Sequence, residues 1–185
     1  AFRKVKGHTW YGVQWSHSLT KPLDFVLGKD LWLNGQGKVG ILYESSYEPW
    51  ADQMTGVRGQ HPGWDPLKYA VEECHKRGLE IYAWVNPFRW ASSGDLNRWT
   101  TPFDEEIKSK GWLLSNGSYI VMNPALPAVR AHIVNVCKEI ITKYSVEGMI
   151  FDDYFYPSGG MAENSTAADY NLWKNSGTSM TIGDW

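Results

Sequence analysis

The stretch that decides the fold is "NPALPAVRAHIVNVCKEIITKYSVEGMIFDDYFYP", residues 123–157. Pro127 suits the first turn of a helix, where no amide donor is needed. The apolar residues that follow recur at helical spacing and predict one buried face: Val129, Ile133, Val136, Cys137, Ile140 and Ile141. A short link, 145–148, then leads into the apolar run 149–151. This order predicts a helix followed by a buried strand that ends at two adjacent aspartates.

The same order of elements occurs upstream. Asp65 can cap a helix that begins at Pro66 and ends at Gly78, and an apolar strand over 79–85 then ends at Asn86. Strands that alternate with helices of this length predict parallel β/α units and an α/β fold. Both strands carry polar residues at their carboxyl ends, the end that bears the chemistry in barrels and in doubly wound sheets.

A long connection, residues 91–122, separates the two units. Within it we expect a loop over 91–99, a short capped helix over 101–111, and a turn with a short strand over 115–124. Insertions of this size are usually functional. The first 38 residues show no clear helical or strand period and predict no particular element.

Composition excludes several classes of function. The formal net charge is −2 with both signs interspersed, so we expect no nucleic-acid partner. No apolar run approaches the ~20 residues needed to span a bilayer, and no signal peptide is visible. Cys74 and Cys137 each lie in a helical apolar pattern and are interpreted as free thiols. No metal-ligand spacing occurs, so we expect neither a metal nor another cofactor, and we make no prediction of oligomeric state.

Aromatic residues are unusually frequent, at 15%, with 11 Trp and 10 Tyr. Their flat apolar faces and polar edges suit stacking on sugar rings. About half of them would be needed simply to fill the core. Composition therefore indicates a carbohydrate ligand without establishing it.

Side-chain alternation along the two strands selects candidate carboxylates. One side of the first strand is polar or aromatic and is assigned to a cleft: Tyr82, Trp84 and Asn86. The other side is aliphatic and is assigned to the helix layer: Ile81, Ala83 and Val85. In the second strand Phe151 suits the helix layer, which turns Asp152 toward the cleft and makes Asp153 the second candidate. The alternative is that both aspartates cap a helix or pair with Arg89.

Other candidates remain open between two roles. Arg89 could clamp a sugar hydroxyl or form a structural ion pair. Asn86 and Asn123 both precede proline, where an asparagine side chain can bond the local backbone instead of a ligand. Tyr43 could stack on a sugar or pack beneath its own loop.

These residues resemble a known family. Residues 42–89, beginning "LYESSYEPW", residues 122–157 and the closing "IGDW" are similar to the glycosyl hydrolase-like 10 family, also called DUF187. Its members are bacterial envelope or secreted (β/α)8-barrel proteins. The resemblance covers residues 39–185 as the amino-terminal part of such a barrel and leaves 1–38 unassigned.

The resemblance implies a glycoside hydrolase, with at least one class of members acting on peptidoglycan glycan strands stripped of peptides. The family's strand-four aspartates correspond to Asp152 and Asp153, which we predict to be catalytic. Its "WxNPxR" motif corresponds to Trp84, Asn86, Pro87 and Arg89, and its "NP" pair to Asn123 and Pro124. The predicted substrate-binding set is Tyr43, Trp84, Asn86, Arg89, Asn123, Tyr154 and Tyr156.

A complete TIM-type (β/α)8 barrel takes about 250 residues. We therefore expect this chain to hold about half of one, truncated after strand four. The proton donor would lie on a later strand, so we expect weak or no turnover by this chain alone. The partner is expected to be an oligosaccharide or glycan strand, and the resemblance implies an extracytoplasmic location.

Two other functions compete with hydrolysis. A non-catalytic carbohydrate-binding domain would use the same aromatic cleft, and its binding would survive Asp152→Asn without any product forming. A metal-dependent hydrolase would use Asp152 and Asp153 as ligands and would depend on divalent ions. The sequence lacks a histidine cluster, which counts against the metal-dependent hydrolase.

Overall fold

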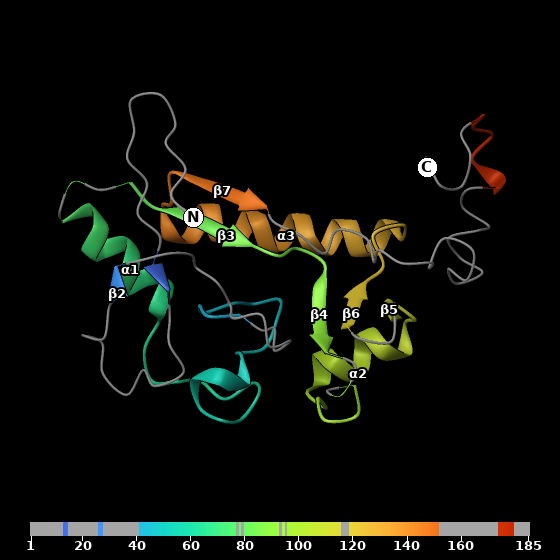
Figure 1. Ribbon diagram of the computed structural model, residues 1–185, viewed down its shortest axis with the longest axis horizontal. Coiled ribbons are helices and arrows are strands. Elements are labelled where there is room, and N and C mark those ends of the chain that lie inside the picture. Colours follow the sequence, from blue (N-terminus) through green and yellow to red (C-terminus); the bar gives the residue numbers. More distant parts are fainter. Residues whose placement is uncertain are drawn as a thin grey trace.

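The structure is a computed structural model, and most of what it describes lies between residues 41 and 151 (Figure 1). The described residues are 41–76, 78, 80–92, 94, 96–115, 119–151 and 174–179, with the backbone of 13–14 and 26–27. Within this part, the side chains of Gln53, Trp84 and Ser92 are not described.

Both helices expected beside the parallel strands form, with proline in the first turn of each. Helix α1 spans Pro66–His75, and the Asp65 carboxylate accepts a hydrogen bond from the Lys68 amide at 2.9 Å. Helix α3 spans Pro127–Tyr144 and ends where Ser145 adopts a left-handed backbone conformation, φ 50°. A left-handed residue is a common way to end a helix. The two predicted helices are confirmed.

Two strands pair in parallel, as the alternation of strands and helices predicts. Strand β3 spans Tyr82–Val85 and strand β7 spans Gly148–Phe151, with Tyr82 opposite Gly148 and Val85 opposite Phe151. Strand β3 is shorter than the predicted 79–85. The two arrows run side by side along α3 in Figure 1.

The connection between β3 and α3 contains a small antiparallel sheet and a helix. Its elements are β4 (Arg89–Ser92), α2 (Pro102–Ser109), β5 (Leu113–Ser115) and β6 (Tyr119–Met122), and the strand order is β4-β6-β5. The helix predicted over 101–111 and the short strand predicted within 115–124 are confirmed as α2 and β6. The expected loop over 91–99 is wrong at its start, because Ala91 is fully buried within β4. We call residues 89–122 the insertion.

The remaining described elements are short. Strands β1 (Val13–Gln14) and β2 (Val26–Leu27) pair antiparallel, and η1 (Asp52–Met54) is a turn of 3-10 helix. A single parallel bridge joins Ile41 to Trp50. In the described part of the chain, no helix combines the length and the apolar character that crossing a bilayer requires.

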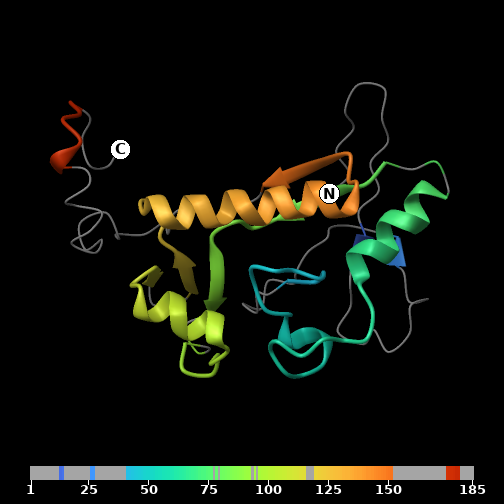
Figure 2. The ribbon, with the colours of Figure 1, turned by 180° about the vertical axis from the view of Figure 1, so that it is seen from behind.

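Helix α3 is shared by two hydrophobic cores. Its carboxyl-terminal half buries Val136, Ile140 and Tyr144 against α1, β3 and the segment near residue 41. Its amino-terminal half buries Val129 and Ile133 against the insertion. Figures 1 and 2 agree on this arrangement, with α1 beside the end of α3 and α2 beneath its beginning. The fold is therefore a mixed α/β arrangement with small sheets.

The helix face predicted for α3 needs one correction. Ile141 is 53% exposed, because the buried residues of α3 recur at 129, 133, 136, 140 and 144. Residue 141 is rotated by about 100° from residue 140 at 3.6 residues per turn. Cys137 is half-buried, and both it and Cys74 are free thiols.

Candidate functional site

The parallel pair β3–β7 defines one edge of the fold where functional residues would gather. Val85 and Phe151 are paired, so the carboxyl ends of the two strands lie at the same edge. Asn86 follows β3 directly, and Asp152 is the residue after β7 in the chain. Asp152 itself lies outside the described residues, as do Asp153, Tyr154 and Tyr156.

The alternation along the two strands agrees with the predicted faces. Ile81 and Ala83 are buried in the core that contains α1 and α3, and Met149, opposite Ala83, packs on the same core. Phe151 shares this parity but is 49% exposed, so it does not fill the helix layer as expected. The described part of β7 ends there.

Asn86 carries a buried acceptor at this edge. Its Oδ1 atom is buried and has no hydrogen-bond donor among the described residues. A buried amide oxygen without a donor costs free energy comparable to a lost hydrogen bond. The local-backbone alternative for Asn86 is therefore not seen, and its amide remains available to a ligand or to a group outside the described residues.

Arg89 and Asn123 approach this edge through the insertion. Strand β4 pairs antiparallel with β6, placing Arg89 opposite Val121, and the Met122 amide donates to the Phe88 carbonyl at 2.7 Å. Arg89 and Asn123 are both buried. The Asn123 Oδ1 accepts from the Ala125 amide at 2.9 Å, so this asparagine takes the local-backbone role. The pairing brings both "NP" segments together.

The structure describes the side chain of Tyr43 but only the backbone of Trp84. Tyr43 is 7% exposed and its ring meets that of Tyr144 edge-on, with centroids 5.4 Å apart. Burial raises the pKa of the Tyr43 hydroxyl. Of the two roles considered for Tyr43, stacking on a sugar or packing beneath its own loop, the structure favours packing. Trp84 lies in β3 opposite Ile150, and its side chain is outside the description.

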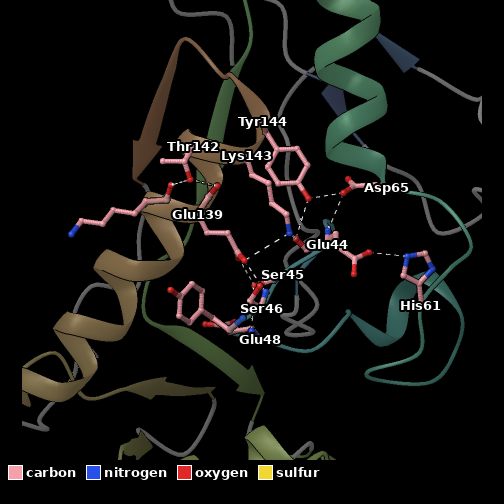
Figure 3. A network of polar contacts seen from close by, with 12 residues as sticks. Glu44, Ser45, Ser46, Glu48, His61, Asp65, Glu139, Thr142, Lys143 and Tyr144 are labelled. Carbon is pink, nitrogen blue, oxygen red and sulfur yellow. Dashed lines mark hydrogen bonds and ion pairs between the residues drawn. The ribbon is translucent and has the colours of Figure 1, made fainter.

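The loop 44–48 is tied to α3 by one carboxylate (Figure 3). Glu139 accepts from the Ser45 hydroxyl at 2.6 Å and from the Ser46 amide at 2.7 Å. The Lys143 Nζ donates to the Glu44 carbonyl at 2.5 Å. These contacts join residues almost a hundred positions apart and fix the loop that the family resemblance singled out as "LYESSYEPW".

The same network continues into the cap of α1. The Tyr144 hydroxyl lies 2.6 Å from Asp65 Oδ2 and 3.1 Å from the Glu44 carbonyl oxygen. Burial, and then the hydrogen bond to Asp65, raise the pKa of this hydroxyl, so it stays protonated and can donate. His61 contacts the Glu44 carboxylate at 2.9 Å (Figure 3).

A second polar cluster lies inside the insertion, around Asp104. Its carboxylate is 0% exposed and accepts from Arg58 Nε at 2.9 Å, Trp90 Nε1 at 3.2 Å and the Thr101 hydroxyl at 2.7 Å. Arg58 also stacks over the Trp99 ring, 3.9 Å from its centroid. Asp104 thus joins the segment after η1 to the insertion, in a structural rather than a chemical role.

His132 joins the loop, α2 and α3. Its Nε2 lies 2.8 Å from Glu48, and its ring stacks on Phe103 with centroids 5.5 Å apart. The rings of Trp112 and Tyr47 lie 5.8 and 6.3 Å away. His132 is therefore held in place by one carboxylate and three aromatic rings.

Sequence reasoning missed the polar anchors Glu139, Tyr144, Asp104 and Glu147. Thr101 and Asp104 form a capping box, a spacing readable in "TPFD". Glu147 accepts from the Ile81 amide at 2.7 Å and from His75 at 2.8 Å, which no local pattern signals. Among the described residues, no group of three His, Cys, Asp or Glu side chains could hold a metal ion.

Comparison with known proteins places these features in a family. The glycosyl hydrolase-like 10 family matches residues 29–184, beginning earlier than the resemblance from residue 39. This match covers most of the chain, so the chain belongs to the glycosyl hydrolase-like 10 family. At this family level the protein is glycosidase-like.

Two relatives illustrate the match. The chain is 32% identical over 155 residues to glycosyl hydrolase DigH of Escherichia coli K12, covering 78% of this chain and 34% of DigH. It is 39% identical over 116 residues to glycosyl hydrolase YngK of Bacillus subtilis 168, covering 62% of this chain and 22% of YngK. The chain therefore spans about a third or less of the length of these relatives.

Proposed function

We propose that this chain forms part of the cleaving site of a glycoside hydrolase barrel that acts on bacterial cell-wall glycans outside the cytoplasm. The observation that carries the proposal is the parallel β3–β7 pair. In β/α barrels, parallel strands bring their carboxyl ends, where the catalytic groups reside, to one face. Asn86 and Asp152 follow the two paired strands in the chain.

The proposal gives each residue a role. Asp152 acts as nucleophile or base, because cleavage of a glycosidic bond needs a carboxylate on one side of the sugar. Asp153 and Arg89 support it, while Trp84 and Tyr154 offer apolar faces to the sugar ring. The second carboxyl group, the proton donor, is assigned to another strand of the complete barrel.

Asn86 contributes a further contact in this proposal. A sugar hydroxyl or an acetamido N–H could donate to its buried Oδ1, the acceptor that has no donor among the described residues. Such a contact would favour the correct sugar, because a ligand lacking the donor leaves the acceptor buried and unsatisfied. Tyr156 completes the proposed sugar-binding set, whereas the side chains of Tyr43 and Asn123 serve packing and the local turn.

The test measures hydrolysis of peptide-free glycan strands by protein expressed from the complete reading frame that encodes this chain. We expect new reducing ends, and Asp152→Asn should lower their rate of formation by about 10²–10⁴-fold, the range for a lost acid–base group. Glu105→Gln, at an exposed position of α2, is the matched control and should leave the rate unchanged.

Two results would overturn the proposal. One is an Asp152→Asn variant as active as the parent protein. The other is a parent protein that binds the glycan strands without forming product, with binding that survives Asp152→Asn. The second result would establish the non-catalytic binding domain instead.

A further inference from the structure

A groove separates α1 from the end of α3, and we call it the α1–α3 groove. Its cavity volume is about 580 Å³, within the range of roughly 300–1,000 Å³ typical of small-molecule sites. The lining residues that matter here are Asp65, Lys68, Glu72 and His75 from α1, and Lys143 and Tyr144 from α3.

The α1 side of the groove is one stripe of the helix. Positions 65, 68, 72 and 75 are three or four residues apart, the spacing that brings side chains to a common face. Acidic and basic groups alternate along this stripe. It therefore offers hydrogen-bond acceptors and donors in turn along the length of the helix.

The floor of the groove is held in place by contacts already described. Asp65 accepts from the Glu44 amide at 3.0 Å and from the Tyr144 hydroxyl at 2.6 Å (Figure 3). Lys143 is fixed by the Glu44 carbonyl. A ligand would meet groups that are already oriented, which lowers the entropy cost of binding.

Two charged groups of the α1 stripe, on Lys68 and Glu72, are not held in this way. Among the described residues, neither the Lys68 Nζ nor the Glu72 carboxylate makes a hydrogen bond or an ion pair, and both residues are exposed. A sugar hydroxyl both donates and accepts, so adjacent Lys and Glu side chains can bond neighbouring hydroxyls of one ring. The nearly balanced charges of the lining select neither an anion nor a strongly cationic ligand.

The groove lies at the opposite end of the parallel pair from Asn86. Ser145, in its lining, leads into β7 through Glu147, whose carboxylate bonds the Ile81 amide just before β3. Each strand has four residues, so its first and last Cα atoms are about 10 Å apart at the usual rise of ~3.3 Å per residue.

We propose that the α1–α3 groove is a second saccharide-binding site. It binds an uncharged, hydroxyl-rich segment of a glycan at a distance from the carboxyl ends of β3 and β7, where hydrolysis is proposed to occur. The choice of a glycan as ligand rests on the proposed function. A groove at the amino ends of the strands would hold a remote part of a long strand and raise its local concentration at the cleaving edge.

The test is a titration of the ¹⁵N-labelled full chain with the uncharged tetrasaccharide of β-1,4-linked N-acetylglucosamine, followed by amide chemical shifts. We expect shifts at Lys68, Glu72 and Ser145. Lys68→Ala and Glu72→Ala should each weaken binding about 3- to 10-fold, the loss of one hydrogen bond of ordinary strength. Lys138→Ala and Glu105→Ala, both exposed and away from the groove, should leave binding unchanged.

The outcomes separate this inference from the proposed function. Shifts confined to the surroundings of Asn86 would overturn the second site while leaving hydrolysis intact. Shifts in the groove, together with no hydrolysis by the protein from the complete reading frame, would support the second site and overturn the proposed hydrolysis. Absence of shifts in the groove at saturating tetrasaccharide would overturn this inference, whatever the hydrolysis assay gives.

Discussion

The parallel half of the molecule and the insertion are stabilised in different ways. The parallel half packs β3 and β7 on α1 and the end of α3 through mostly aliphatic side chains, with its ion pairs at the rim. The insertion buries two tryptophans together with the charged pair Arg58–Asp104. A continuous helix–strand pattern builds the first region, whereas a polar cluster organises the second.

The difference lies in the helices that cover the strands, because the strands of both regions have only three or four residues. Both regions share α3, but α1 in the parallel half has 10 residues and α2 in the insertion has 8. Such short strands bury little area of their own. Large indole rings and a fully bonded carboxylate supply the missing contacts, at the risk that loss of one member leaves the others buried and unsatisfied.

The largest effect on the free energy of unfolding is expected from Asp104→Ala. The change removes the acceptor for donors on three residues, Arg58, Trp90 and Thr101, and leaves the Arg58 side chain, only 5% exposed, without its carboxylate. Breaking a buried pair in this way costs about 3–5 kcal/mol of unfolding free energy. Urea denaturation measures the loss, and Glu105→Ala on the same helix should change the midpoint little.

If Asp104→Ala were as stable as Glu105→Ala, the contrast between the two regions would disappear. The insertion would then depend on apolar packing in the same way as the parallel half.

A smaller effect is expected in the parallel half from Gly148→Ala. A Cβ atom there would meet two ring carbons of Tyr82, each at 2.7 Å, because the ring of its cross-strand partner lies over the glycine. Overpacking of this kind costs about 1–3 kcal/mol. Gly94→Ala in the insertion is the matched control, since its Cβ would have no heavy atom within 4 Å.

The double variant Gly148→Ala with Tyr82→Ala sharpens this test, because removing the ring should recover part of the loss. A Gly148→Ala protein as stable as Gly94→Ala would show that Tyr82 does not lie over Gly148 in solution.

The smallest effect on stability is expected from the ionisation of two glutamates, Glu147 in the parallel half and Glu106 in the insertion. Partial burial opposes ionisation of Glu147, but the hydrogen bonds from the Ile81 amide and His75 outweigh it, so its pKa lies below the ordinary value. The hydrogen bond and charge of Lys110 lower the pKa of exposed Glu106 in the same direction. A lowered pKa stabilises the fold above the unfolded pKa, and this contribution is lost as the pH falls through the folded pKa.

We therefore expect the stability difference between the parent protein and Glu147→Gln to be full near neutral pH. It should shrink as the pH falls from the unfolded glutamate pKa of about 4.3 through the lower folded pKa. Carboxyl-carbon NMR titration of Glu106 and Glu147 gives both pKa values directly. High salt should return the Glu106 pKa toward its ordinary value and move that of Glu147 less, because exposed charges are screened more strongly. Equal salt responses would contradict this distinction.

The helices and the parallel strands could be predicted because their signals are local. Asp65 and Pro66 mark the start of α1, and Pro127 with the apolar positions after it marks α3. Strand β4 escaped prediction because Ala91 and Ser92 are small and look like a loop. The burial of Ala91 comes from pairing with β6, about 30 residues later in the chain.

The candidate site could be predicted only in part. The position of Asn86 after β3 follows from the strand pattern, but its buried acceptor does not. The anchoring role of Glu139 depends on Ser45 and Ser46, which are more than ninety residues away in sequence. Long-range contacts of this kind leave no periodic trace, so they appear only in the folded structure.

The tryptophan pair of the insertion has an optical consequence. The Trp90 and Trp99 rings lie with centroids 5.2 Å apart and planes at 84°. Indole transitions held this close and this oblique couple to each other, and the coupling gives circular dichroism a signed pair of bands. The corresponding aromatic pair in the parallel half consists of two tyrosines, Tyr43 and Tyr144. Loss of the packing between these two rings can therefore be followed by its own spectral signature.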